Sequence, residues 1–252
     1  MKVFSVVNIK GGVGKTISTI NIGACLQELG YKVLIVDLDS QGNASKILKC
    51  YSMDDESVTE VLLNKETDIK KVIKNTDYEN FNILPSNVTL AFAERQILMD
   101  TTRSQQNRLA RALKVLENDY DFCIIDCPPS LSMVTINALV ASNEVIVPIK
   151  LDQFALDGLG YLLDSINEIK EEFNHSLKFT GCFITMDNAT TVNRVVKEHL
   201  RKTLNDKILN TTIKNNVKVV ESTYEQIPVV FSNKRATASL NYRQLTKEIL
   251  NK

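Results

Sequence analysis

The stretch Lys10-Gly-Gly-Val-Gly-Lys-Thr16 decides the fold, because it is a glycine-rich phosphate-binding loop with an additional lysine at its start. It follows a short apolar and β-branched run, Val3–Val7, and precedes helical apolar spacing over Ser18–Leu29. A glycine loop that joins a strand to a helix is the context in which this motif binds nucleoside triphosphates. We therefore predict a P-loop nucleotide-binding protein and set aside a chance glycine turn.

Each residue type in the loop suits one task in holding ATP and magnesium. The glycines permit backbone angles closed to other residues and bring N–H groups close to phosphate oxygens, while the following helix directs its positive end there. Lys15 would reach the β- and γ-phosphates, and the Thr16 hydroxyl would ligate Mg²⁺. The loop residues expected to bind ATP are Lys10, Gly11, Gly12, Val13, Gly14, Lys15, Thr16 and Ile17.

Length and composition fit one globular unit. The chain has 252 residues, 44% of them apolar, and no proline- or glycine-rich linker divides it, so we expect a single domain over residues 1–252. The five cysteines are odd in number and lie largely in apolar segments, which favours reduced core thiols over a disulfide framework. Neither a signal peptide nor a membrane-spanning stretch is recognisable. We expect a soluble, cytoplasmic protein.

Charge is unevenly distributed along a chain whose formal net charge is zero. Residues 1–189 hold 18 lysines and arginines against 25 acids, whereas residues 190–252 hold 12 against 5. A basic C-terminal segment can contact a phosphate backbone, although this one lacks interleaved aromatic residues for base stacking. On charge alone, we favour a solvated helix face over a DNA footprint.

Apolar periodicity predicts alternating strands and helices. After Val3–Val7, strands are expected at Lys32–Asp37, Asn82–Leu84, Phe122–Asp126, Glu144–Pro148 and Phe179–Thr185. After Ser18–Leu29, helices are expected near Val88–Leu98, Gln105–Leu116, Gly158–Phe173, Val192–Leu204 and Ser239–Leu250. This alternation predicts a doubly wound α/β fold, with a mostly parallel sheet and helices on both faces. Its ligand site lies at the carboxyl ends of the strands.

Three acids follow these strands and are candidates for phosphoryl-transfer chemistry. Asp126 ends the apolar run Ile124-Ile125, as suits a carboxylate that holds the magnesium shell; a strand-end cap is the alternative. Asp37 and Asp39 are two residues apart, and the turn residues after them indicate that they do not share a face. We expect Asp37 to have a structural role and Asp39 to orient the attacking water.

Four motifs occur in order along the chain, and together they carry a family resemblance. They are Lys10–Thr16, Asp37-Leu-Asp-Ser-Gln-Gly-Asn43, Leu84-Pro-Ser-Asn87 and Ile125-Asp-Cys-Pro-Pro129. With Val147-Pro148, Thr185-Met186 and Ile213–Val217, they extend over essentially the full length. The chain resembles ParA/Soj-like partition ATPases, which belong to the deviant Walker A class of P-loop ATPases.

The resemblance implies a cycle. Two subunits would sandwich two ATP molecules, and Lys10 would cross to the partner's nucleotide, in the way that an arginine finger does. The ATP-bound homodimer would bind DNA without sequence preference and so associate with the nucleoid. A ParB-like centromere-binding protein would then stimulate hydrolysis and release the DNA. The implied catalytic residues are Asp39, Lys10 and Lys15.

The sequence also departs from the family pattern. Ile17 stands where a second Thr or Ser is usual, and Ser40 replaces the usual proline after Asp39, from which we expect slow turnover. The family's Ile-Pro-Arg-Asn segment reads Ile213-Lys-Asn-Asn216 here, which implies Lys214 and Asn216 at the adenine. Of two arginines linked to DNA binding in relatives, one position is Lys218. The other is Thr190, with Arg194 one helical turn away.

Other functions share the same nucleotide motifs. A MinD-like membrane-cycling ATPase needs a membrane-binding tail, whereas Leu240–Lys252 has the pattern of a packed helix. An iron–sulfur reductase component needs cysteines at a dimer seam, and Cys127 has no suitable second cysteine. A binding module that uses ATP only as a switch, with negligible turnover, is kept open by Ile17 and Ser40.

Overall fold

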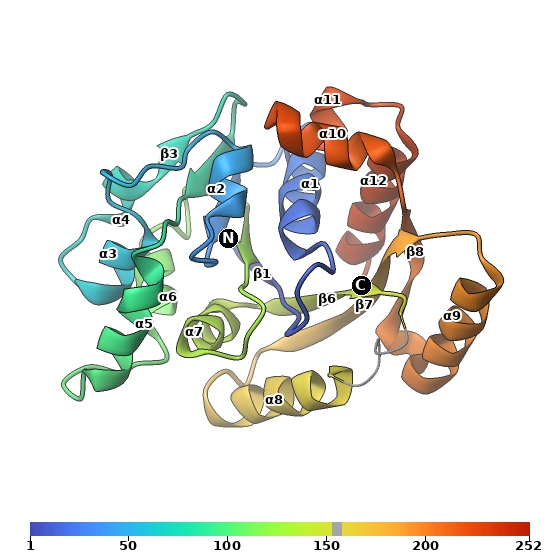
Figure 1. Ribbon diagram of the computed structural model, residues 1–252. Coiled ribbons are helices and arrows are strands. Elements are labelled where there is room, and N and C mark those ends of the chain that lie inside the picture. The colour runs from blue at the N-terminus through green and yellow to red at the C-terminus, as the bar shows by residue number, and fades with distance from the viewer. Residues whose placement is uncertain (153–157) are drawn as a thin grey trace.

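The computed structural model describes residues 1–152 and 158–252, and their strands form one twisted eight-stranded sheet in the order β3-β4-β2-β5-β1-β6-β7-β8 (Figure 1). The strands are β1 (Lys2–Val6), β2 (Val33–Asp37), β3 (Lys74–Asn75), β4 (Phe81–Leu84), β5 (Phe122–Asp126), β6 (Glu144–Lys150), β7 (Lys178–Asp187) and β8 (Ile208–Lys214). All neighbouring pairs are parallel except β3 and β4. The predicted mostly parallel sheet is confirmed.

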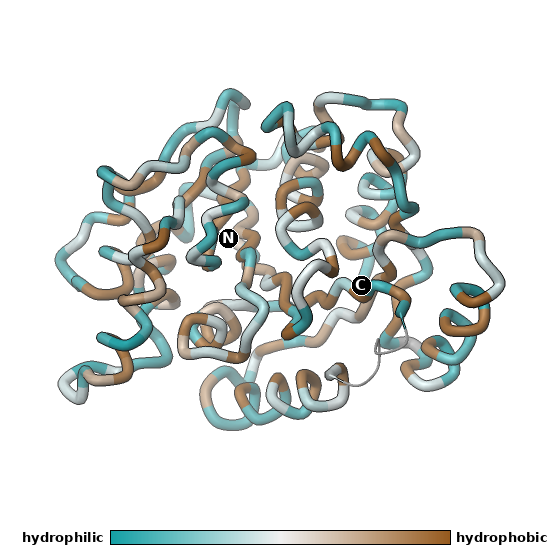
Figure 2. Tube along the Cα trace, in the orientation of Figure 1, coloured by the Kyte–Doolittle hydropathy of each residue, from teal (hydrophilic) through white to brown (hydrophobic). Residues whose placement is uncertain are grey.

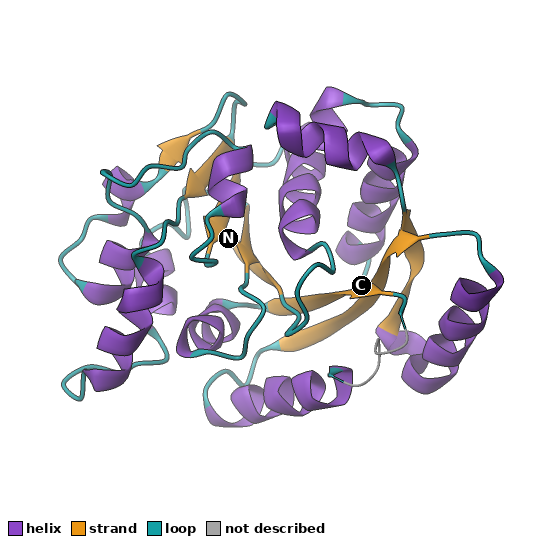
Figure 3. Ribbon diagram, in the orientation of Figure 1, coloured by secondary structure: helices purple, strands orange, loops and turns teal. Residues whose placement is uncertain are grey.

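Helices cover both faces of this sheet, as Figure 3 shows. One layer consists of α1 (Lys15–Glu28), α2 (Asn43–Ile47), α10 (Val217–Glu225), α11 (Val229–Ser232) and α12 (Thr237–Leu250). The other consists of α3 (Val58–Leu63), α4 (Ile69–Val72), α5 (Leu90–Met99), α6 (Arg108–Lys114), α7 (Met133–Ala141), α8 (Leu159–Glu172) and α9 (Thr191–Leu204). A short 3₁₀ turn, η1 (Asn205–Lys207), leads into β8.

Two hydrophobic cores result, one on each face, because successive strand residues point to opposite sides. In β2, Val33 and Ile35 pack with α1 and α12, whereas Leu34 and Val36 pack with the opposite helix layer. Both sets are fully buried, as is typical of a central strand in a parallel sheet. Figure 2 shows the corresponding hydrophobic colour along the central strands.

The predicted elements all form, with shifted ends. Helix α1 begins at Lys15 rather than Ser18, because the left-handed Gly14 caps it directly after the glycine loop. Several elements were not predicted: α7 is apolar all round and lacks a clear period, and α2, α3 and α4 are short, with 5, 6 and 4 residues. Strand β8 was missed as well, although its residues alternate in burial.

The cysteines and the C-terminal segment match the sequence expectations. Cys25, Cys123, Cys127 and Cys182 are buried, Cys50 is half-buried, and all five are free thiols. Helix α12 buries Tyr242, Leu245 and Ile249 in the core shared with α1, so it is a packed helix.

Among the described residues, none of the helices combines the length and the apolar character needed to cross a bilayer.

Candidate nucleotide-binding site

The site begins at the carboxyl end of β1, where the loop Lys10–Thr16 leads into α1. Gly12 and Gly14 have φ values of 70° and 83°, the left-handed region that favours glycine. No side chain caps the first turn of α1, and that turn holds no acid. Its backbone N–H groups are therefore available to an anion, and the helix dipole favours negative charge there.

Side chains from two other strand ends hold the loop in place. The Asn8 carboxamide accepts a hydrogen bond from the Lys10 N–H at 2.9 Å and donates to the Pro148 carbonyl at 2.8 Å. The Thr185 hydroxyl donates to the Val13 carbonyl at 2.9 Å. The loop is thus tied to β6 and β7 and is pre-organised before any ligand arrives.

The two lysines of the loop lie in different environments. Lys15 is 7% exposed, and its ammonium donates to the Lys10 carbonyl at 3.0 Å. Burial lowers the pKa of Lys15, while the negative charges of Asp126 and Asp39 oppose that shift. The Lys10 ammonium pairs with both carboxylate oxygens of Asp152, at 2.5 and 2.6 Å. Lys15 thus faces the acids at the strand ends, whereas Lys10 lies toward the end of β6.

Asp37 and Asp39 have separate surroundings, as the turn residues predict. Asp37 is fully buried, and its Oδ2 accepts hydrogen bonds from the Ser45 N–H and hydroxyl at 2.9 and 2.7 Å. Its other oxygen accepts from the Asp39 N–H at 3.1 Å. Asp39 is half-buried, and its Oδ1 accepts from the Gln41 N–H at 2.9 Å. Asp37 therefore holds the turn, and Asp39 remains accessible.

A cavity of about 330 Å³ adjoins Asp39, at the end of β2 and the loop after β5. Its lining includes Ser40, Glu94 and Pro128-Pro129. Glu94 accepts a hydrogen bond from the Met133 N–H at 2.9 Å, which fixes the start of α7. The accessible carboxylate of Asp39 therefore borders a space large enough for water.

Asp126 is the most unusual group of the site. It is fully buried, and it lies opposite Asp37 in the β2–β5 register and opposite Val6 in β1–β5. Neither of its oxygens accepts a hydrogen bond of normal geometry from the described residues, although the Thr16 hydroxyl lies near enough to favour its charge. Burial and the Asp37 charge raise the pKa of Asp126 well above its ordinary value.

A buried carboxylate without a partner costs free energy unless a cation or another donor satisfies it. Thr16 and Asp126 supply the oxygen donors that Mg²⁺ prefers, and this ion usually takes only one or two protein ligands beside phosphate and water. Among the described residues, no group of three or more His, Cys, Asp or Glu side chains forms a self-sufficient metal site. The residues present therefore fit a magnesium ion held jointly with a phosphate ligand.

A second cavity, of about 160 Å³, lies on the other side of the loop. It brings together Gly14, Ile17, Lys214 and Asn216, with apolar walls. The remaining lining residues are Thr185, Met186, Ile213, Asn215, Val219, Val220 and Tyr242. The residues suggested for the adenine thus lie beside the phosphate loop although they are 200 positions apart in sequence.

Two of these residues already have structural partners. The Lys214 ammonium pairs with Asp187 at 3.0 Å, and Asp187 also pairs with Lys197 of α9 at 2.7 Å. The Asn216 side chain accepts from the Lys218 N–H at 2.9 Å and caps α10. The structure gives each a task in holding the wall of the cavity, and their role at the adenine stays a prediction.

The two candidate DNA-binding residues lie on different helices. Arg194 is exposed on α9, and Lys218 lies on α10 with its ammonium 2.6 Å from Glu221. Figure 1 shows α9 and α10 as separate elements, which follow the neighbouring strands β7 and β8. Their role in DNA binding stays a prediction.

Three residues of the site were not singled out from the sequence as functional: Asn8, Asp152 and Thr185. Asp152 follows β6 as Asp39 follows β2, so the pattern of an acid just after a parallel strand could have indicated it. Thr185 and Asn8 act on backbone groups that are distant in sequence or in the loop, and only their hydrogen bonds identify them.

Comparison with known proteins extends these observations. The family described as "AAA domain" matches residues 1–179. The sporulation initiation inhibitor protein Soj of Bacillus subtilis is 38% identical over 249 residues, which cover 98% of each chain. The chromosome partitioning protein ParA of Caulobacter vibrioides is 30% identical over 253 residues, covering 100% of this chain and 95% of that protein.

Among solved structures, one from Mycobacterium smegmatis, named cobyrinic acid a,c-diamide synthase and holding an ATP analog and magnesium, is 34% identical with a TM-score of 0.86. The superposition covers 99% of this chain and 94% of that one. The similarity therefore extends over both the nucleotide loop and the C-terminal helices.

Proposed function

Because the chain belongs to the Soj/ParA family of chromosome-partitioning ATPases, we propose that it hydrolyses ATP to drive DNA partition. The observation that supports this most directly is the buried Asp126 carboxylate, which finds no hydrogen bond of normal geometry among the described residues and acts on Lys15 at the phosphate loop. This arrangement suits a bound nucleotide with its cation. The reaction is ATP + water to ADP + phosphate.

In the proposed complex, loop amides of residues 10–17 hold the phosphates and Lys15 neutralises the β- and γ-phosphate charge. Thr16 and Asp126 hold Mg²⁺, which neutralises charge on the β- and γ-phosphate oxygens when bound. Lys214 and Asn216 border the base, in the cavity that they share with Ile17. Relatives of this fold bind such ligands: the Mycobacterium smegmatis structure contains an ATP analog and magnesium.

Hydrolysis needs a positioned water and a neutralised transition state. Asp39 accepts a hydrogen bond from the attacking water, whose oxygen forms a bond to the γ-phosphorus while the bond to the bridging oxygen breaks. Lys10 adds positive charge from the partner subunit in an ATP-bound homodimer. To do so, its ammonium must leave the ion pair with Asp152. We therefore expect Lys10 to contact the partner's nucleotide only in the nucleotide-bound dimer, where its ammonium has left Asp152.

The output of the cycle is reversible binding to DNA. Basic residues of the C-terminal segment, Lys218 and Arg194 among them, contact the phosphate backbone without reading sequence. A ParB-like centromere-binding protein stimulates hydrolysis and releases the DNA. Lys218 and Arg194 lie on separate helices, α10 and α9, which follow the neighbouring strands β8 and β7.

The experiment that tests this function measures binding of a random-sequence DNA duplex with ATP and with ADP, at fixed magnesium and two salt concentrations. We expect binding only with ATP, and weaker binding at high salt because counterions are released. The variant Lys15→Ala, which cannot neutralise the phosphates, serves as the matched control. No DNA binding in either nucleotide state would contradict the partition function.

The same samples separate the alternatives. Liposome association with ATP but not ADP would indicate a MinD-like cycle instead. Phosphate release that stays at background, with and without DNA, would indicate an ATP-gated binding switch. We expect slow but measurable release, because Ile17 and Ser40 alter contacts near the nucleotide.

A further inference from the structure

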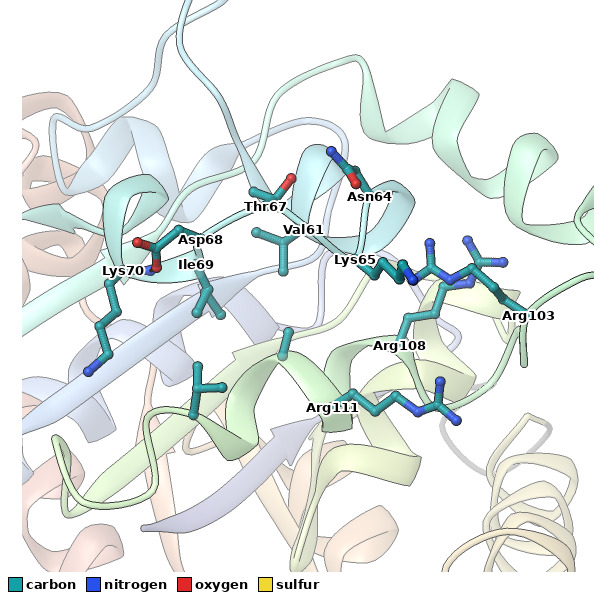
Figure 4. A pocket seen from close by; sticks show the side chains of 12 residues that line it. Val61, Asn64, Lys65, Thr67, Asp68, Ile69, Lys70, Arg103, Arg108 and Arg111 are labelled. Carbon is teal, nitrogen blue, oxygen red and sulfur yellow. Dashed lines mark hydrogen bonds between the residues drawn. The ribbon is translucent and has the colours of Figure 1, made fainter.

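A cavity of about 490 Å³ lies between α3, α4 and α6, on the sheet face opposite α1 (Figure 4). Its volume falls in the range of small-molecule sites. None of its lining residues belongs to the phosphate loop or to the cavities beside Asp39 and Ile17. They are Val61, Asn64, Lys65, Thr67, Asp68, Ile69, Lys70, Arg103, Arg108, Arg111, Ala112 and Val115.

The lining is basic although it belongs to the acidic part of the chain. Five lysines and arginines line the cavity against one acid, whereas residues 1–189 as a whole contain more acids than bases. Like charges gathered in one concave site repel one another and raise the local concentration of anions. The charge of this cavity is therefore a local feature that the overall composition does not explain.

Two of the arginines have structural partners that hold them in place. Arg108 has a side chain 2% exposed, pairs with Asp100 at 2.8 Å, and donates to the Leu62 carbonyl at 3.2 Å. Arg103 donates to the Leu63 carbonyl at 2.7 Å. Both therefore satisfy carbonyls at the C-terminal end of α3. Arg103 keeps most of its five N–H donors for another ligand.

Other cations of the cavity lack comparable partners. The side chain of Arg111 makes no hydrogen bond or ion pair with the described residues, and Lys65 lies 3.6 Å from Glu66 with both side chains over 70% exposed. Lys70, by contrast, pairs with Asp119 at 2.8 Å. Figure 4 shows Lys65, Arg103 and Arg111 on one side of the cavity and Lys70 with Asp68 on the other.

Part of the remaining wall is apolar, beside the polar residues Asn64, Thr67 and Asp68. Val61 and Ile69 are buried, whereas Val115 is 60% exposed despite lying beside them in the cavity. A ligand with an apolar body would cover this surface and gain free energy from its burial. The cavity therefore offers a cationic side and an apolar side to the same molecule.

We propose that this cavity binds a small organic phosphate. Its phosphate group lies among Arg103, Arg111 and Lys65, and its apolar body lies on Val61, Ile69 and Val115. Guanidinium groups match the geometry of phosphate oxygens in paired hydrogen bonds, and phosphate carries more charge than a carboxylate. The site is separate from the phosphate loop and does not depend on the proposed partition function.

The test uses the full chain with ADP and Mg²⁺ present, so that the phosphate loop is occupied. Phenyl phosphate is titrated while backbone amide signals are followed by NMR. We expect saturable shifts at residues 61–70 and 103–115, with loop amides responding to ADP instead. Phenyl phosphate should bind more tightly than inorganic phosphate, which lacks the apolar body, and than benzoate, which lacks the second charge.

Charge-reversed variants make the test specific. Arg111→Glu and Lys65→Glu should each weaken phenyl phosphate binding by about tenfold or more, since they remove a charge-assisted hydrogen bond. Lys114→Glu changes charge by the same amount on the same helix but outside the lining, and should alter affinity by less than about twofold. Equal weakening by Lys114→Glu would overturn the site. So would benzoate binding as tightly as phenyl phosphate, or the absence of shifts at these amides up to about 10 mM.

Discussion

Three aspartates within one small region perform different tasks because their surroundings differ. Asp37 accepts hydrogen bonds from three donors, and Asp39 borders a cavity. Asp126 is buried and accepts no hydrogen bond of normal geometry from the described residues. Desolvation of a carboxylate costs free energy, so of the two fully buried acids only Asp37, which has donors, is satisfied in the nucleotide-free protein. Asp126 therefore carries an electrostatic cost that a bound cation would relieve.

Replacing Asp126 with Asn tests that cost. At pH 7.5 the nucleotide-free variant should unfold at a higher temperature than the parent, because burying a neutral amide costs less free energy than burying a carboxyl group that is ionised in the unfolded state. Its ATP turnover should fall by about 10- to 100-fold, the usual effect of disturbing groups that hold a metal. Calorimetry and phosphate release measure the two effects. The control is Asp77→Asn, which changes an exposed acid in the same way. An unfolding temperature that falls in Asp126→Asn but not in Asp77→Asn would contradict the electrostatic cost assigned to Asp126.

The buried Asp37 predicts a pH dependence of stability. Burial raises the pKa of Asp37 from 3.8 to about 6, so the folded state binds a proton that the unfolded state has already released between these values. Its contribution is fully present below about pH 4 and is lost as pH rises through about 6. The loss is on the order of 3 kcal/mol.

Urea unfolding of the nucleotide-free parent and of Asp37→Asn across pH 4–8 measures the effect of Asp37 together with its interaction with Asp126, since acids distant from this pair cancel in the difference. The stability of the parent relative to the variant should decrease between about pH 4 and 6 and stay level above that. A difference that does not change with pH would contradict the raised pKa.

Lys10 is the residue whose proposed role depends on a second subunit. In the single chain it pairs with Asp152, so removing it should leave the folded monomer and its ADP affinity intact. We expect Lys10→Ala to abolish ATP-dependent dimerisation or stimulated turnover, because the transition-state charge is no longer neutralised in trans. Light scattering and phosphate release are the measurements, and normal values of both would disprove the trans role.

At the scale of elements, the turn between β2 and α2 determines where Asp39 lies. Gly42 has a φ of 61°, and an added Cβ would lie 2.9 Å from the Ser86 carbonyl oxygen and 2.7 Å from the Tyr51 ring. The Gly42 N–H also donates to the Asp39 carbonyl at 2.9 Å. The turn therefore stays compact even though Ser40 replaces the proline usual in the family, because Gly42 and the Asp39 side chain close it.

Gly42→Ala should destabilise the fold by about 1–3 kcal/mol, from the left-handed backbone and the close approach to Ser86. ATP turnover should fall further than stability alone explains, since Asp39 moves with the turn. Gly160→Ala is the matched control, because nothing lies within 4 Å of its added Cβ and alanine favours the helix. Chemical denaturation measures the free energy of unfolding. A Gly42→Ala protein as stable as the parent would contradict the strain expected at Gly42.

At the scale of the whole molecule, the basic C-terminal segment is spread over several elements. Helix α9 carries Arg194, and α10 carries Lys218. Both helices connect to the nucleotide site: Asp187 links α9 to Lys214, and Asn216 caps α10 beside the same cavity. The elements proposed to contact DNA are therefore adjacent to the wall of the cavity beside Ile17.

Lys218→Ala should weaken DNA binding in the presence of ATP. The slope of log affinity against log salt concentration should fall in magnitude by about one, because one phosphate contact is lost. Nucleotide affinity should not change. Glu221→Gln should have the opposite effect, because it releases the Lys218 ammonium from its 2.6 Å ion pair. Fluorescence anisotropy over a salt series measures both. Unchanged affinity in both variants would exclude Lys218 from the DNA surface.

The sequence by itself determined the phosphate loop, the alternation of the main strands and helices, the doubly wound sheet and the family resemblance. The structure confirms the sheet, and the comparisons confirm the family. These follow from local patterns: glycine spacing, apolar periodicity and acids at strand ends. Only the tertiary structure decided that Asp126 finds no hydrogen bond of normal geometry among the described residues while Asp37 has three donors, and that Asp152 holds Lys10. It also gathered Lys65, Arg103 and Arg111 around one cavity. Burial and hydrogen bonding depend on contacts between residues far apart in the chain, and a local pattern carries no record of them.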